Sequence, residues 1–274
     1  MPIITITREM GSLGKDVARE LGRALKVPVV YHEVIDHLAD RMRLRKSHVI
    51  RLLDGSAGLL ERLTADKTSL SLFTADEIMG LAAKGGGAVI RGWGATHLLR
   101  EVPHAVCVRV CAPFETRKQR MMERLGSDDE AHVADEIRSN DEAHSAIMRR
   151  HFGLQWTDSE HYDLVVNTKR VSVEECVSEV LSLVRSPQFM ETESSRAKLG
   201  DLALAASVRA ALRRAPETRE AQVGVSSEAG RVTLSGAGST DEMLAFVEVA
   251  AAVPGVSDVA YRTHPGEELR PRFH

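Results

Sequence analysis

Runs of β-branched and other apolar residues alternate with segments of helical periodicity through the first two thirds of the chain. The runs predict short buried strands, at 3–7, 29–31, 88–90, 105–110 and 164–166. The segments between them place apolar residues three or four positions apart and predict helices, at 16–25, 33–83 (interrupted at 54–55 and at 58), 113–126, 131–151 and 172–184. Strands that alternate with helices are typical of an α/β fold, a parallel sheet flanked by helices on both faces.

The pattern changes after this region. Residues 186–198 are polar and aperiodic, which predicts a linker. Beyond it, the order helix, strand, strand, helix, strand predicts a small α+β (αββαβ) unit, with elements at 199–214, 222–226, 231–235, 240–252 and 256–261. We therefore expect two domains, at 1–185 and 199–264, followed by a tail at 265–274.

Composition and charge exclude several classes of protein. The chain of 274 residues carries 36 Lys and Arg residues against 39 Asp and Glu residues, a net charge of −3. This balance argues against a general nucleic-acid binder, because such domains carry a clear basic excess. We find no signal peptide and no apolar stretch near the ~18 residues of a membrane span. The three cysteines, Cys107, Cys111 and Cys176, form no CxxC pattern and predict buried, reduced thiols. We expect a cytoplasmic protein.

A glycine-containing turn joins the first predicted strand to the first helix. Its residues are Gly11, Ser12, Leu13, Gly14, Lys15 and Asp16. Backbone N–H groups at such a helix start suit an anionic phosphate, and Lys15 would add a point charge. The pattern G-x-x-x-x-G-K-[ST] is only partly met, because Glu9 replaces the first glycine and Asp16 the hydroxyl residue. On this motif alone, a tight turn without a ligand explains the segment as well as a nucleotide site does. Asp16 is a candidate Mg²⁺ ligand, or a helix-start residue favoured by the dipole.

Several stretches in order carry a resemblance to a known family. They are TREMGSLGKD (7–16), VVYHE (29–33), AVIRGWGA (88–95), ERLG (123–126) and YDLVVNT (162–168). Over about residues 1–185 the chain resembles the cytidylate kinase-like family of P-loop proteins. The resemblance implies ATP-dependent phosphoryl transfer to a nucleoside monophosphate, with Mg²⁺ and with cytidylate as the first candidate acceptor. It makes the protein a candidate kinase, a phosphotransferase.

Arginines are the candidate groups for stabilising the transferred charge, because phosphoryl transfer needs positive charge and little covalent chemistry. Arg117, Arg120 and Arg124 share a narrow sector of the predicted helix at 113–126, and Arg149 lies on the next helix. For any one of them, a solvated basic face is the alternative interpretation. The resemblance implies that Arg117, Arg120 and Arg149 form a lid. These three arginines, together with Lys15 of the turn, are the candidate catalytic residues.

The acceptor site departs from the family pattern. Members often read Gly-Arg-Gly-Ala where this chain has Trp93 between two glycines. Arg91, two residues earlier, either takes over the phosphate contact or is an edge arginine at a strand end. Trp93 stacks on a base or fills space under a loop. Asp163 meets the ribose or base, or simply begins a strand. His144 stands where members carry arginine, and an imidazole of pKa ~6.5 cannot replace a guanidinium. These departures leave a second hypothesis open, a non-catalytic nucleotide sensor coupled to the C-terminal unit.

The C-terminal unit, residues 199–264, resembles a BON domain. The resemblance rests on Val208 and Leu212 of the first helix, on RVTLSG (231–236) and on VPGVSDV (253–259). It implies contact with phospholipid or with a protein. A small regulatory or dimerising module is the alternative, so a homodimer is a further possible partner state.

Overall fold

The computed structural model describes residues 2–54, 66–92, 94–220 and 222–263. Contacts between Cα atoms divide the chain into two compact units. The first unit comprises Met1–Ala65 and Gly85–Glu191, and the second comprises Asp66–Lys84 and Thr192–His274. The second unit therefore includes a segment from the middle of the chain as well as the C-terminal region.

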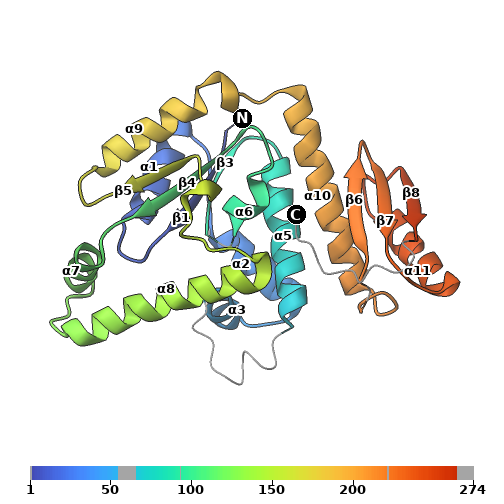
Figure 1. Cartoon of the computed structure of the whole chain (residues 1–274), viewed down its shortest axis with the longest axis horizontal. Coiled ribbons are helices and arrows are strands. Elements are labelled where there is room, and N and C mark those ends of the chain that lie inside the picture. Colours follow the sequence, from blue (N-terminus) through green and yellow to red (C-terminus); the bar gives the residue numbers. More distant parts are fainter. Residues whose placement is uncertain (1, 55–65, 93, 221, 264–274) are drawn as a thin grey trace. The chain divides into compact units, whose positions relative to one another are not determined.

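A five-stranded parallel sheet forms the centre of the first unit (Figure 1). The strand order is β2-β3-β1-β4-β5. The strands are β1 (Ile3–Arg8), β2 (Val29–Val30), β3 (Ala88–Arg91), β4 (Ala105–Cys111) and β5 (Leu164–Asn167). The central strand, β1, is buried from Ile3 to Thr7, as the β-branched composition of these residues predicts. The predicted α/β fold with a parallel sheet is confirmed.

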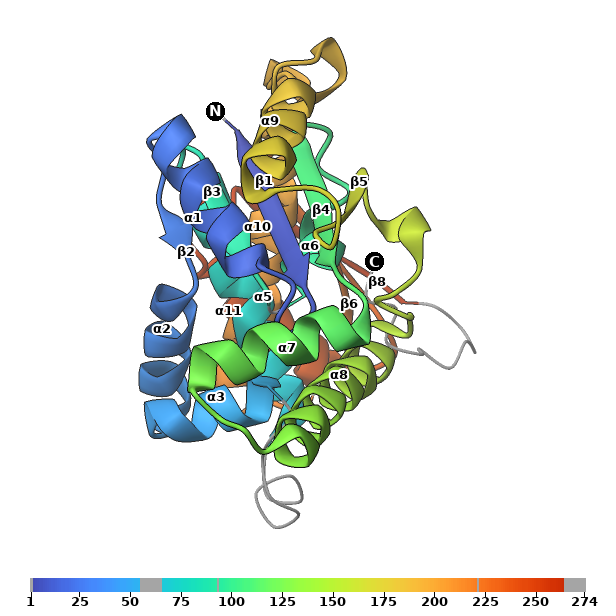
Figure 2. The same cartoon turned by 90° about the vertical axis from the view of Figure 1, so that its left-hand side faces the viewer.

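Helices cover both faces of this sheet. They are α1 (Gly14–Leu25), α2 (His32–Met42), α3 (Lys46–Asp54), α6 (Ala95–Leu99), α7 (Phe114–Leu125), α8 (Glu130–Phe152) and α9 (Val173–Val184). Figure 2 shows α1 and α9 on the same face, where Val17, Leu21 and Val180 pack on Ile4 and Ile6. On the opposite face, the Thr5 Oγ1 of β1 lies 2.8 Å from the Thr96 Oγ1 of α6.

The region predicted as interrupted helix, 33–83, contains a break that the sequence analysis missed. The helix α2 ends at Arg43, whose φ of 53° lies in the left-handed region and stops the helix. The predicted interruptions at 55 and 58 lie outside the described residues. The last helix of this stretch, α5 (Lys67–Ala83), belongs to the second unit.

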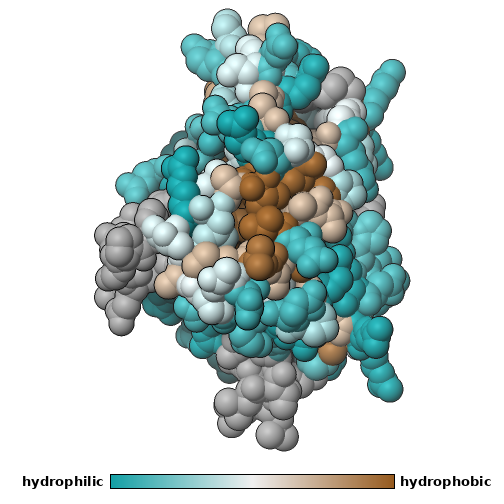
Figure 3. Space-filling view, turned by 90° about the vertical axis from the view of Figure 1, so that its right-hand side faces the viewer, coloured by the Kyte–Doolittle hydropathy of each residue, from teal (hydrophilic) through white to brown (hydrophobic). Residues whose placement is uncertain are grey.

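The second unit contains a three-stranded sheet in the order β6-β7-β8. Its elements are α5, α10 (Glu193–Arg214), β6 (Gly224–Glu228), β7 (Arg231–Ser235), α11 (Thr240–Ala251) and β8 (Asp258–Arg262). The order αββαβ from α10 onward confirms the prediction. Val232 and Leu234 of β7 are fully buried, as the strand alternation predicts. Figure 3 shows hydrophobic residues gathered in one area with hydrophilic residues around it.

The helix α10 begins earlier than the predicted start at Leu199, within the segment expected to be a linker. A capping box explains this start. The Thr192 Oγ1 accepts a hydrogen bond from the Ser195 N–H at 3.1 Å, and the Ser195 Oγ accepts one from the Thr192 N–H at 2.9 Å. Among the helices of the described residues, none has the length and apolar content needed to cross a bilayer.

Candidate active site

The turn between β1 and α1 is shaped by two close backbone approaches. Gly11 has a φ of 80°, and a Cβ atom there would lie 2.7 Å from the carbonyl oxygen of Arg117. A Cβ atom on Gly14 would lie 2.6 Å from the Cβ of Arg8. Both contacts are closer than real Cβ atoms tolerate, so both positions require glycine. Leu13, the N-cap residue of α1, adopts the left-handed conformation with a φ of 63°. The turn therefore leads directly into the helix.

This turn leaves backbone donors available at the positive end of α1. Within the described residues, the N–H groups of Leu13, Gly14 and Lys15 form no hydrogen bond. The Ser12 N–H differs, because it donates to the Glu9 carbonyl oxygen at 3.1 Å. Unpaired N–H groups at a helix N-terminus form an anion-binding position. The turn therefore fits a nucleotide phosphate, and Lys15 is exposed beside it.

Glu9 replaces the first glycine of the motif. Its side chain belongs to a buried network of charged groups. Its carboxylate accepts hydrogen bonds from Arg109 at 2.7 Å and from the Ala112 N–H at 3.1 Å. It also lies 3.4 Å from the Nε of Arg117. The Glu9 and Arg109 side chains are each 12% exposed. This network joins the end of β1 to β4 and α7.

The predicted lid residues Arg117 and Arg120 contact the turn itself. The Arg117 guanidinium donates to the Ala112 and Met10 carbonyl oxygens, at 3.1 and 3.3 Å, and to Asp141 at 2.8 Å. Arg120 donates to the Gly11 carbonyl oxygen of the turn at 3.5 Å, and to the hydroxyl and the carbonyl oxygen of Thr168 at 3.0 and 2.8 Å. In this structure, both side chains fix the position of the turn.

The two remaining predicted residues of the phosphate site, Arg149 and Asp16, are accessible to solvent. Arg149 is exposed on α8. Asp16 is partly exposed in the first turn of α1 and forms an ion pair with Arg19 at 2.8 Å. Mg²⁺ in phosphate sites is held by one or two carboxylates together with the substrate's phosphates. The Asp16 carboxylate fits this requirement as one ligand, provided that its ion pair with the exposed Arg19 breaks.

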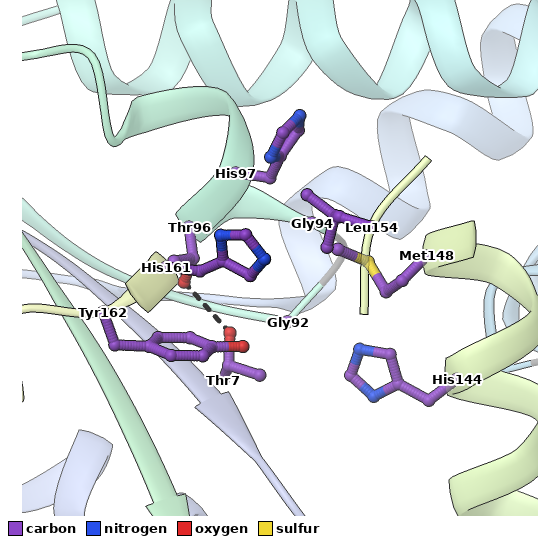
Figure 4. A pocket seen from close by; sticks show the side chains of 10 residues that line it. All are labelled: Thr7, Gly92, Gly94, Thr96, His97, His144, Met148, Leu154, His161 and Tyr162. Carbon is purple, nitrogen blue, oxygen red and sulfur yellow. Dashed lines mark hydrogen bonds between the residues drawn. The ribbon is translucent and has the colours of Figure 1, made fainter. Parts of the chain in front are cut away.

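A small pocket opens on the α6 side of the sheet (Figure 4). Thr7 of β1 and Thr96 of α6 form part of its wall, and their hydroxyl oxygens lie 3.0 Å apart. Among the described residues, the lining is Thr7, Gly92, Gly94, Thr96, His97, His144, Met148, Leu154, His161 and Tyr162. The alternation of Thr with Ile in β1 is the sequence signal that could have indicated this polar wall.

Two imidazoles of the pocket are held in the neutral form. Burial lowers the pKa of His97 to about 4, with the charge of Arg100 adding to the effect. Burial also lowers the pKa of His144 to about 4, with smaller effects from the charges of Arg8 and Arg109. The His144 ring stacks on Trp156 with 4.2 Å between ring centroids. At neutral pH each ring therefore offers one N–H donor and one nitrogen acceptor.

Two of the predicted acceptor residues, Arg91 and Asp163, do not line this pocket. Arg91 is 7% exposed, and its guanidinium lies 3.9 Å from the centroid of the Tyr31 ring. The Asp163 Oδ2 accepts a hydrogen bond from the Cys107 N–H at 2.7 Å. Burial raises the pKa of this Asp163 carboxyl above its usual range. Trp93 lies outside the described residues.

The parallel sheet and the glycine turn at the start of α1 together define an α/β domain with a candidate phosphate-binding turn. Residues 3–170 match the cytidylate kinase-like family, and residues 200–264 match the BON domain. The chain belongs to the cytidylate kinase-like family and carries a C-terminal BON domain. Both resemblances stated from the sequence are confirmed.

Individual relatives are distant. The chain is 25% identical over 182 residues to a cytidylate kinase of Pyrobaculum aerophilum, an alignment that covers 65% of this chain and 89% of the relative. An uncharacterized protein from Eubacterium ventriosum is similar in structure, with a TM-score of 0.53 and 21% identity over 68% of this chain and 99% of the other. A shikimate kinase from Bacteroides thetaiotaomicron matches with a TM-score of 0.42 and 14% identity, over 68% and 99%.

Proposed function

We propose that the protein transfers a phosphoryl group from ATP to a nucleoside monophosphate, with cytidylate as the first acceptor to test. The observation that carries this proposal is the group of N–H donors at Leu13, Gly14 and Lys15, which find no partner in the part of the chain that the structure describes. The polar pocket supports it further, because its wall residue Thr7 belongs to the same end of β1 from which the turn departs. A donor phosphate on the turn and an acceptor in the pocket would thus be neighbours.

The proposed roles follow from charge and position. The N–H donors and Lys15 would hold the β- and γ-phosphates of ATP. Mg²⁺, held by Asp16 and the phosphates, would neutralise the negative charge that develops on the phosphate oxygens during transfer. Arg117 and Arg120 would keep the carbonyl oxygens of the turn in place, and Arg149 would approach from the surface of α8. The predicted contacts of Arg91, Trp93 and Asp163 with the acceptor remain part of this proposal.

The neutral imidazoles suit the uncharged part of the acceptor. His97 has both ring nitrogens buried, and within the described residues neither forms a hydrogen bond. A buried ring with an unused donor and an unused acceptor favours a ligand that offers both, such as a base edge or a ribose hydroxyl.

A second function, a nucleotide sensor without turnover, is favoured by one specific observation. The cations Arg109 and Arg117 are committed to Glu9 and Asp141, and Asp16 is committed to Arg19. An active site with these pairs intact would bind ATP but would have less positive charge available to stabilise transfer.

Two measurements separate these functions. Coupled ADP formation is measured over a panel of nucleoside monophosphates, and ATP binding is measured by calorimetry with and without Mg²⁺. Turnover with any monophosphate supports the kinase. ATP binding without turnover supports the sensor, and the absence of ATP binding contradicts both.

For the BON domain we propose contact with phospholipid or with a partner protein. Its exposed Leu244, in α11, is 62% exposed, which provides an apolar contact on the surface of this unit. Flotation with anionic vesicles tests the lipid contact, and sedimentation tests the homodimer. Failure of both would leave a role internal to the chain.

A further inference from the structure

Arg8 is the last residue of β1 and lies directly before the turn. A Cβ atom on Gly14 would meet the Cβ of Arg8 at 2.6 Å and its Cδ at 3.4 Å. The aliphatic part of the Arg8 side chain therefore runs across the backbone of Gly14, at the first residue of α1. The sequence analysis assigned no role to this arginine.

The charge of Arg8 has no partner in the described part of the chain, where its side chain forms neither a hydrogen bond nor an ion pair. Neighbouring arginines differ: Arg109 binds Glu9, Arg117 binds Glu9 and Asp141, and Arg120 binds Thr168. Arg8 is only partly exposed. A partly buried cation without a counter-charge is costly unless an anion binds to it.

The position of Arg8 relates the turn to the pocket. Its stem contacts Gly14 of the turn, while the preceding residue, Thr7, lines the pocket. His144, another pocket residue, lies within range of this charge: burial is the main cause of the lowered pKa of its imidazole, and Arg8 adds a smaller effect. The end of β1 therefore contributes one residue to the pocket and the next residue to the contact with the turn.

We propose that Arg8 binds the γ-phosphate of ATP and stays with the phosphoryl group during its transfer. This inference rests on the proposed function. In the transfer, an acceptor phosphate oxygen forms a bond to the γ-phosphorus while the bond from that phosphorus to the β,γ-bridging oxygen breaks. ADP leaves with the electron pair of the broken bond. Arg8 exchanges no proton and supplies a planar fork of N–H donors that matches phosphate.

This role compensates for two positions at which this chain lacks a cation that the family pattern has. Trp93 stands in the place of an arginine, and His144, in the place of another, is neutral at pH 7. Arg8 supplies a guanidinium from a different element, the end of the central strand.

The test compares ATP with ADP, because only ATP has the γ-phosphate. Calorimetric titrations at one Mg²⁺ concentration are made for wild type, Arg8→Gln, Arg8→Lys and the control Arg23→Gln, an exposed arginine of α1 that is 69% exposed. We expect Arg8→Gln to weaken ATP binding about tenfold or more and ADP binding less than about twofold. Arg8→Lys should lie between, and Arg23→Gln should match wild type.

Either of two results would overturn the proposal: unchanged ATP affinity in Arg8→Gln, or an equal loss of ATP and ADP affinity. The second result would indicate a role in shaping the turn only. Circular dichroism melting of each variant checks the fold, and Arg8→Lys keeps the comparison valid if Arg8→Gln does not fold. Wild-type turnover is assayed separately, so a failed kinase hypothesis is distinguishable from a failed role of Arg8.

Discussion

Glu9 and Arg117 approach to 3.4 Å between Oε2 and Nε, and their side chains are 12% and 8% exposed. This pair ties the residue that replaces the first glycine of the motif to the helix that faces the turn. The replacement therefore has a structural consequence: a carboxylate supports the turn from behind and does not occupy the phosphate position.

We expect Glu9→Gln to lower the free energy of unfolding of the N-terminal unit by about 3 kcal/mol, because it leaves two arginines short of their buried counter-charge. Urea unfolding measures this change. Glu20→Gln is the control, since Glu20 pairs with Arg23 at the surface and should change stability by less than about 1 kcal/mol. Equal effects of the two substitutions would contradict the buried network.

Lys15→Ala should reduce turnover by about 100-fold or more, because it removes a point charge from the phosphates in the transition state. Lys15 is exposed, so the melting temperature should stay close to that of wild type. Steady-state kinetics of ADP formation measure the effect, with Arg23→Ala as the control. A variant that keeps wild-type turnover would remove Lys15 from the mechanism.

His144 should make the fold sensitive to acid. Its pKa is about 4 in the folded state, chiefly because of burial, against 6.5 as the ordinary value. The unfolded chain therefore binds more protons between these values, and stability falls as the pH drops from about 6.5 toward 4. His144→Phe, which keeps a ring against Trp156, should reduce that loss. Urea unfolding at pH 7 and at pH 5 gives the comparison, and equal pH dependence in both proteins would refute the assignment.

Asp66 should stabilise the C-terminal unit. Its carboxylate accepts a hydrogen bond from the Ser69 N–H at 3.0 Å, which caps α5, and two from Arg213 of α10 at 2.9 Å. We expect Asp66→Ala to cost about 1 kcal/mol in the unfolding of this unit. Asp241→Ala, at an exposed position of α11, is the control. Hydrogen exchange of α10 amides localises the effect, and unchanged protection there would count against it.

The sequence predicted those parts of the fold that depend on local pattern. The β-branched run at 3–7 and the glycines of the turn are sufficient to place a strand, a turn and a helix in order. The packing of α5 on α10 was not predictable in this way. Its contacts, such as the bond of 2.6 Å from the Ser207 Oγ to Asp76, join residues far apart in the sequence.

The candidate site likewise contains a part that local sequence identifies and a part that only the folded chain brings together. Gly11, Gly14 and Lys15 are neighbours in sequence, so a short motif identifies them. The pocket takes Thr7, Thr96 and His144 from three separate elements, and no spacing in the sequence relates them. The free charge of Arg8 is visible only once the partners of the surrounding arginines are known.

The exchange of α5 between the two parts of the chain affects how the protein can be taken apart. The chain passes from one unit to the other at 65–66, returns at 84–85 and leaves again at 191–192. A protease that cuts once, between Ser186 and Thr192, would release no fragment that corresponds to either unit. The helix α5 would stay covalently in the N-terminal fragment, although it packs with elements of the C-terminal fragment. The nicked halves should co-elute under native conditions and separate only in denaturant.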